Sequence, residues 1–490
     1  MTSLTSALSN ALAGLLVTSG QSAVVSRNIT RASDPDYNKE KLTLTTNADG
    51  GVSSGALQRA ANKQLSDALL NATSDSAGQK AILNAFSALS STVGDVQADG
   101  SVAWGVDQLQ QALQVSESDP SNITNASQVI AKAKSLAQIL NDASKQVETV
   151  REQADSGMAT SVNNINTLLA QFQKLDNALS SGTISPDQKA AAQDQSDAIL
   201  KQLSQEIGIR TQSRADGSTA IYTDSGVTLY DRTPRTITFA PSLTLAATSN
   251  GNAVYADGVQ IVGPNSPMPT KSGNIAAYAK VRDEVGPTYQ NQLDEIARGL
   301  ITTFAETDQG SPATNPDATG LFGYPGSPTV PAASTLSQGL AAQISVNSAF
   351  DSAVGGNPYL LRDGGANGSS YVYNTSSQSG FQTRLSSLIG AMTKPMTFDS
   401  ATKLSTNYSI AGLSSASAGW VEQGRSDATA ASTAADAVTS RATDALSRET
   451  GVNIDEEMSQ LLALEKSYQA AAKIMTTVNS MLGDLMDSVR

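Results

Sequence analysis

Three short motifs contain residue types that could catalyse hydrolysis. They are the Ser-x-x-Lys tetrad Ser400–Lys403, the Ser-x-Asn triplet Ser405–Asn407 and the Lys-Ser-Gly triplet Lys271–Gly273. In penicillin-binding hydrolases the lysine of such a tetrad activates its serine. The spacing does not fit that chemistry, because the second motif begins two residues after the first and the third precedes both. We interpret the matches as chance occurrences in a serine-rich chain.

The sequence lacks the residues of most metal sites and common catalytic arrangements. It contains no histidine and no cysteine, which excludes Ser-His-Asp and Cys-His catalysis, disulfides and metal sites built on these ligands. The segment from Asn315 begins like a calcium-binding loop, but its twelfth position is Gly326 where such a loop needs glutamate. We predict no catalytic residue, no cofactor and no bound metal, and we do not expect an enzyme.

The composition indicates long helices that pack through small side chains. Of the 490 residues 39% are hydrophobic but only 4% are aromatic, and the net charge of −13 argues against a nucleic-acid partner. The apolar run Ala11–Val17 is too short to span a bilayer, and the first basic residue is Arg27, unlike a cleaved signal peptide. We expect no membrane partner, and either a cytosolic protein or export by a route that reads no cleaved hydrophobic signal.

The last forty residues carry an apolar pattern that repeats every seven residues. Two positions of each heptad are apolar, as in the a/d seam of a coiled coil. The first position holds Ile454, Leu461, Tyr468, Met475, Leu482 and Val489, and the second holds Leu464, Ala471, Val478 and Leu485. We expect Asn453 to cap this helix, since acidic residues follow it in the first turn.

The first thirty residues repeat this pattern more weakly. The seam positions are Leu8, Leu15, Ser22 and Ile29, together with Leu4, Ala11, Thr18 and Val25. Three of the eight are small or polar and bury little apolar area, whereas ordering the backbone costs about 1 kcal/mol per residue. An intramolecular helix pair that closes a globular domain is one interpretation. The thin seam favours another, in which helices from other copies complete the packing.

We therefore predict an assembly interface at both ends of the chain. Its residues are Leu4, Leu8, Leu15, Val25, Ile29, Ile454, Leu461, Leu464, Tyr468, Met475, Val478, Leu482, Leu485 and Val489.

Between the two ends, helical spacing surrounds a β-rich region. Helices are expected over 56–89, 125–179, 186–207, 275–304 and 413–446, with a kink at Pro287, and a β-meander over 207–263. We predict a mainly α fold with β-rich insertions, a long helical bundle and a terminal coiled coil. Three domains follow: a coiled-coil domain from 1–33 and 452–490, a helical bundle from 34–206, 273–308 and 410–451, and β-rich outer parts from 207–272 and 309–409.

Four segments resemble the flagellar hook-associated protein 1 family, the hook–filament junction proteins. They are Gly451–Glu457 with Tyr468–Ile474 near the end of the chain, Arg282–Glu284 with Leu293–Ala297, Asp194–Asp197 with Ile207–Ile209, and Asn28–Arg31 with Asp36–Lys39. Two positions depart from the family pattern, because Ser196 replaces an arginine and Asp36 replaces the glycine that precedes Tyr37.

The resemblance implies a non-enzymatic structural protein of the bacterial flagellum, needed for flagellum assembly and motility. Such proteins are secreted through the flagellar type III export channel and polymerise at the end of the hook. The implied partners are further copies of the chain, the hook protein, the second junction protein and a cytosolic chaperone on the C-terminal helix. The alternatives are another axial protein (the second junction protein, a hook protein or a flagellin) and, more distantly, a secreted adhesin or serine hydrolase.

Overall fold

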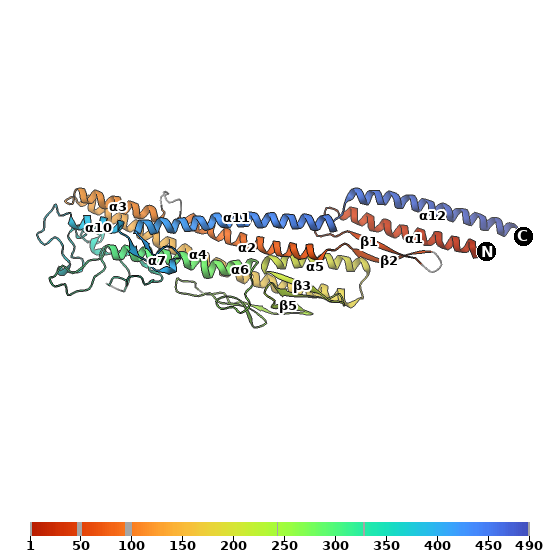
Figure 1. Ribbon diagram of the computed structural model, residues 1–490, viewed down its shortest axis with the longest axis horizontal. Coiled ribbons are helices and arrows are strands. Elements are labelled where there is room, and N and C mark those ends of the chain that lie inside the picture. The colour runs from red at the N-terminus through yellow and green to blue at the C-terminus, as the bar shows by residue number, and fades with distance from the viewer. Residues whose placement is uncertain (1, 47–50, 94–99, 243, 327–328, 489–490) are drawn as a thin grey trace.

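The protein forms a long rod, and both ends of its chain lie at the same end of that rod (Figure 1). The computed structural model describes residues 2–46, 51–93, 100–242, 244–326 and 329–488. The terminal helices α1 (Thr2–Arg31) and α12 (Ile454–Ser488) lie side by side beyond the rest of the molecule. The fold is mainly α with small β-rich insertions, as predicted from the sequence.

Long helices make the body of the rod. They are α2 (Lys63–Val93), α3 (Val102–Ser118), α4 (Ile123–Ser181), α5 (Pro186–Glu206), α6 (Asn274–Lys280), α7 (Gly286–Thr303) and α11 (Ile410–Thr450). The start of α5 follows from its sequence, because Ser185 and Gln188 form a reciprocal capping box and Pro186 occupies the first turn. α4 runs unbroken through Gly157. There the ring of Tyr278 lies where a β-carbon would stand.

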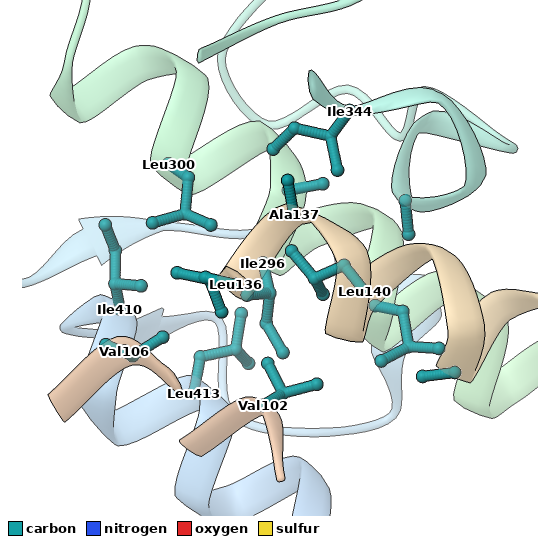
Figure 2. Close-up of a cluster of buried hydrophobic side chains, with 14 of the residues drawn as sticks. Val102, Val106, Leu136, Ala137, Leu140, Ile296, Leu300, Ile344, Ile410 and Leu413 are labelled. Carbon is teal, nitrogen blue, oxygen red and sulfur yellow. The ribbon is translucent and has the colours of Figure 1, made fainter. Parts of the chain in front are cut away.

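One core cluster joins segments that are far apart in the chain. Figure 2 shows Val106 of α3, Leu136 of α4, Leu300 of α7 and Leu413 of α11 packed against one another. All four side chains are fully buried. The helical body is therefore assembled from the two halves of the sequence.

The predicted meander is present as two small antiparallel sheets. The first has the order β3 (Ile209–Ser213), β4 (Thr219–Thr223), β5 (Thr228–Asp231) and β6 (Thr233–Pro234), and the second has the order β7 (Ile237–Thr238), β8 (Val254–Ala256) and β9 (Val259–Val262). Both cover the second half of α4, on the side of the rod away from α11 (Figure 1).

Residues 304–409 form the irregular far end of the rod. Their helices are α8 (Leu340–Gln343), α9 (Leu360–Asp363) and α10 (Thr383–Thr393), and their strand pairs are β10 (Phe322–Gly323) with β11 (Ser345–Val346) and β12 (Met396–Thr397) with β13 (Asn407–Tyr408). Four single 3₁₀ turns are described between them, at Ser348–Phe350, Ser352–Val354, Ser369–Tyr371 and Ser400–Thr402.

The prediction of helix from residue 56 was wrong at its start. Residues 40–59 form a hairpin of β1 (Glu40–Thr46) and β2 (Val52–Arg59), and α2 begins only at Lys63, after Asn62 has capped it. Leu42 and Leu44 alternate with polar residues, which is the period of a strand with one covered face. The hairpin lies in the segment 34–206 that we assigned to the helical bundle, and it packs against α1.

The helix over 274–303 is irregular immediately before Pro287, where the kink was predicted. Residues Val281–Val285 form one π-helical turn, which fits a proline that has no N–H group to donate to the preceding turn. The turn holds Arg282 in the interior, paired with Asp155 at 2.7 Å and with Asp283 at 2.8 Å. Arg151 of α4 donates to the carbonyls of residues 245, 246 and 249, which fixes the β-rich insertion on the rod.

Candidate assembly interface

α1 and α12 lie side by side and antiparallel (Figure 1). The structure places the predicted interface residues in three groups. Val25 and Val478 are buried, Leu8, Leu15, Ile29, Leu461, Leu464, Met475 and Leu482 are half-buried, and Ile454, Tyr468 and Leu485 are exposed. The side chain of Leu4 and the whole of Val489 lie outside the described residues. Most of the predicted seam is therefore used inside one chain, between its own two ends.

A second set of apolar side chains on the same helices faces solvent. In the heptads of α12 these residues flank the seam on both sides, Met458 and Met486 at the e position and Ile474 and Met481 at the g position, with Leu462 farther out at the b position. α1 adds Leu12 and Leu16, of which Leu16 is 64% exposed. Such flanking positions usually carry charged residues in a two-stranded coiled coil. These exposed apolar residues, here called the stripe, were not predicted from the sequence, because they lie outside the a and d positions of the heptad.

The apolar character of α1 extends beyond the run found in the sequence. Its segment Thr5–Arg31 is long and apolar enough on average to cross a membrane, although a helix near the N-terminus passes this test for other reasons as well. In the structure one side of the helix packs on α12 and another packs on the hairpin. Leu42 of β1 reaches to within 3.2 Å of a β-carbon placed at Gly20.

The terminal pair meets the rod in a polar cluster, here called the joint, made of residues 27–40, 59, 187, 194, 197 and 450–457. At its centre the buried amide of Asn28 makes four hydrogen bonds. It donates to the backbone carbonyl of Glu40 at 2.9 Å and to the carboxylate of Glu457 at 2.9 Å. It accepts from the hydroxyl of Tyr37 at 2.7 Å and from the backbone N–H of Glu40 at 3.1 Å. One side chain thus ties together α1, the turn after it, the hairpin and α12.

Lys39 holds the break between α11 and α12. Its backbone N–H donates to the carbonyl of Thr450, the last residue of α11, and its ammonium contacts Glu456 at 3.1 Å and Glu457 at 3.0 Å. Burial lowers the pKa of Lys39, but the hydrogen bonds to the two glutamates outweigh it and raise this pKa above its usual value. Asn453 caps α12 as predicted, accepting from the backbone N–H of Asp455 at 3.1 Å.

Two arginines connect the joint to α5. Arg27 pairs with Glu40 and with Asp187, each at 3.0 Å. Burial raises the pKa of Glu40, and the charge of Arg27 opposes this rise only in part. Arg59, at the end of the hairpin, pairs with Asp194 at 2.6 Å and with Asp197. The hairpin and α1 are therefore bound to the rod by charge pairs as well as by packing.

A cavity of about 500 Å³ opens beside the joint. It lies between the turn 31–38, the start of α2, α5 and the end of α11, and its lining mixes leucines such as Leu70 and Leu446 with charged residues. The charged groups pair with one another, Lys63 with Asp67 at 2.9 Å and Lys201 with Asp36 at 3.8 Å. We interpret the cavity as space left around a joint, since its polar groups satisfy each other.

Two family models match this chain, and together they cover more than half of it. The model of the flagellar hook-associated protein FlgK helical domain matches residues 86–321, which include α3, α4, α5, most of the β-rich insertion and α7. The model of the flagellar basal body rod FlgEFG protein C-terminal matches residues 447–488, which include α12. The chain belongs to the flagellar hook-associated protein 1 family.

A solved structure shows the same fold. The flagellar hook junction protein FlgK from Burkholderia pseudomallei superposes with a TM-score of 0.55 at 14% sequence identity, covering 77% of this chain and 99% of that one. A search of curated protein sequences gives no significant match. As a member of the hook-associated protein 1 family, the chain is a structural component of the bacterial flagellum that assembles in association with the hook.

Three of the four segments that resemble this family contribute residues to the joint, whereas Arg282–Glu284 with Leu293–Ala297 lies in the body of the rod. Asn28, Tyr37 and Lys39 come from the N-terminal segment, Asp194 from α5 and Glu457 from the C-terminal one. Asp36, where the hook-associated protein 1 family usually has glycine, does not adopt a positive φ. The turn therefore needs no glycine here. The carboxylate of Asp36 instead lies 3.8 Å from the ammonium of Lys201 of α5.

The hydrolase-like motifs lie in different parts of the rod. Ser400–Lys403 packs on α7, where Gln292 donates to the carbonyl of Thr402 at 2.9 Å. Ser272 lies just before α6 and bonds to Ser74 and Asp224. The two positions are separated by about 19 residues of helix, roughly 30 Å. The three motifs therefore do not form one site.

Proposed function

We propose that the protein polymerises at the distal end of the hook and joins the hook to the filament. Its neighbours would be further copies of the chain, the hook protein and the second junction protein. The observation that carries this proposal is the exposed apolar stripe on α1 and α12, because a monomer rarely leaves so many large apolar side chains uncovered in one region.

The stripe fits packing against several helices at once. Most a and d positions of α12 are at least partly covered, so the apolar residues at e and g remain for other partners, together with the exposed seam residues Ile454, Tyr468 and Leu485. Helices that are apolar at these flanking positions have a contact face wider than a two-helix pair uses. We infer that the terminal pair inserts between the terminal pairs of sister copies and lines an inner tube, with the predicted seam residues and the stripe forming the interface together.

The rest of the molecule would face outward from this tube. In the division that we propose, residues 1–33 and 452–490 form the tube, the helical bundle surrounds it, and the β-rich parts at 207–272 and 309–409 lie outermost. Figure 1 supports part of this arrangement, since the terminal pair projects from one end of the rod and the described residues of 309–409 lie at the opposite end.

The same exposed residues of α12 support the inference that a chaperone binds this helix before export. Met458, Leu462, Met481 and Met486 would be uncovered apolar surface in the cytosol, where aggregation or premature polymerisation would compete with secretion. We infer that a cytosolic chaperone covers the C-terminal helix before the chain leaves the cell through the flagellar type III channel.

Binding to purified hooks tests the proposal. We expect the full-length protein to bind at hook tips, and we expect the double variant Leu462→Ser, Met481→Ser to bind at least tenfold more weakly. Removing a large apolar side chain from a contact costs about 1.5–3 kcal/mol, and 1.4 kcal/mol corresponds to tenfold in affinity. The matched control is Val259→Ser, an equally apolar exposed residue in the β-rich insertion. Unchanged tip binding of the double variant, or an equal loss in the control, would contradict the proposal.

A further inference from the structure

The seam between α1 and α12 contains few contacts that would favour one register of the two helices over another. It repeats every seven residues, and its buried positions on α1 include Ala11, Thr18 and Val25. Thr18 carries the one hydroxyl among them, and this hydroxyl donates to the carbonyl of Gly14 in its own helix at 2.7 Å. A shift of one heptad would again place small and aliphatic residues opposite aliphatic ones.

Asn28 breaks this degeneracy. Between residues 7–31 of α1 and 454–484 of α12, its bond to Glu457 is the one side-chain hydrogen bond that joins the two helices. Asn28 is 1% exposed and Glu457 is fully buried. Both groups are therefore cut off from water, which would otherwise replace the bond in a shifted pair.

A shifted register would leave both groups without this partner. Moving α1 by one heptad toward the end of α12 would bring Asn28 opposite Leu464, whose side chain cannot accept or donate a hydrogen bond. Glu457 would then lie level with residue 35, beyond the end of α1 at Arg31. A buried polar group without a partner shifts an equilibrium by roughly tenfold to a hundredfold. The Tyr37 hydroxyl and the backbone N–H of Glu40 would lose their acceptor as well.

We propose that Asn28 sets the register of α1 against α12. A single buried asparagine has this role in some coiled coils, where it selects one alignment at a cost in stability. Lys39 holds Glu457 in place and the hairpin holds Asn28, so the bond is anchored to the rod on both sides. The register is a property of the single chain. Its consequence, the alignment of Leu12 and Leu16 with the stripe of α12, rests on the proposed function.

Disulfide trapping tests the register directly, because the chain contains no cysteine of its own. In an antiparallel pair anchored at Asn28 and Glu457, equal rise along both helices brings Ala11 level with residue 474, next to the seam residue Met475. A shift of one heptad brings Ala11 level with residue 481, next to the seam residue Leu482. Two full-length proteins are needed, one with Ala11→Cys and Met475→Cys and one with Ala11→Cys and Leu482→Cys. The rate of intramolecular disulfide formation under a mild oxidant is measured for each.

We expect the 11–475 disulfide to form at least tenfold faster than the 11–482 disulfide. With Asn28→Leu added, the ratio of the two rates should fall at least fivefold, while the helical signal in circular dichroism is kept. The control Thr18→Val changes a buried polar residue that makes no bond across the pair, and it should leave the ratio unchanged.

Three results would overturn the proposal. They are a ratio that Asn28→Leu does not change, an equal change in Thr18→Val, and a starting protein in which 11–475 does not dominate. Loss of both disulfides together in Asn28→Leu would count against it too, because Asn28 would then be needed for pairing and not for choosing a register. Hook binding is measured separately, so failure of the proposed function would not be mistaken for failure of this one.

Discussion

The backbone N–H of Lys39 donates to the carbonyl oxygen of Thr450 at 2.7 Å, at the point where α11 ends. The ammonium of the same Lys39 contacts Glu457 in the first turn of α12. One residue near the start of the chain thus binds the end of one C-terminal helix and the beginning of the next. The orientation of the terminal pair relative to the rod depends on this contact between the two halves of the chain.

Replacing Lys39 should loosen the joint. Lys39→Ala removes the cation that faces the buried Glu457, and we expect a loss of roughly 1–3 kcal/mol in the free energy of unfolding of this region. Hydrogen exchange of the amides in residues 454–460 measures it. The matched control is Lys41→Ala, an exposed lysine two residues along the same strand. Equal exchange in the two variants would show that the pair with Glu457 does not stabilise the joint.

The ends of the isolated monomer should be cut first by a protease. α12 exposes Lys466 and Lys473 on a helix that has one partner, whereas Arg282 and Arg298 are buried in the rod. We expect trypsin to remove roughly the first and last 35–40 residues before it cuts the body, as mass spectrometry of the fragments would show. Termini that outlast the irregular segment 304–409 would argue against the assembly role of the terminal pair.

The stability of the rod should depend on the protonation of Asp294. Burial raises the pKa of Asp294 to about 6, although the backbone N–H groups of Ala341 and Gly339 donate to its carboxylate and lower it. The folded state then binds this proton more tightly than the unfolded chain, whose pKa lies at 3.8. The contribution of Asp294 is therefore largest at acidic pH, and it is lost as the pH rises through about 6.

The comparison with Asp294→Asn isolates this contribution. Between pH 4 and pH 7 the wild-type protein should lose about 3 kcal/mol of unfolding free energy relative to the variant, since each unit of pKa shift corresponds to 1.36 kcal/mol. Denaturant unfolding at a series of pH values measures the difference. A difference between the two proteins that stays constant across this range would contradict the raised pKa.

Two glycines of α11 should respond to alanine in opposite directions. A β-carbon at Gly424 would lie within 2.8 Å of three atoms of the Phe86 ring, while one at Gly419 meets nothing within 4 Å. We expect Gly424→Ala to destabilise the rod by about 1–3 kcal/mol through overpacking. Gly419→Ala should stabilise it by up to about 1 kcal/mol through helix propensity. The fluorescence of Trp420, which packs against Phe86, can follow both unfolding curves.

Patterns within a few neighbouring residues were enough to predict much of the fold. The heptads of the two ends, the helix that begins at Pro186, the turn-separated strands of the meander and the irregular helix before Pro287 are all local signals. The hairpin of β1 and β2 was missed because its two strands are largely polar, and their covered face exists only where they pack on α1 and α5.

The role of each apolar residue on the terminal helices could not be predicted in the same way. The heptad pattern identifies an apolar face, but which part is covered depends on how closely the other helix approaches. Thus Val478 is buried and Leu485, at the same heptad position, is exposed. The e and g residues were not predicted as part of the interface. The local sequence does not distinguish exposed apolar residues that bind a partner from those that stay exposed.

By itself, the sequence determined the helical class of the protein, the heptad ends and the lack of histidine and cysteine chemistry, because these depend on residue types and on spacing along the chain. Only the tertiary structure decided that Asn28 meets Glu457, that Lys39 spans the break between α11 and α12, and that one apolar stripe stays uncovered. These contacts join residues more than 400 positions apart. Their energies depend on burial and distance, which exist only once the chain has folded back on itself.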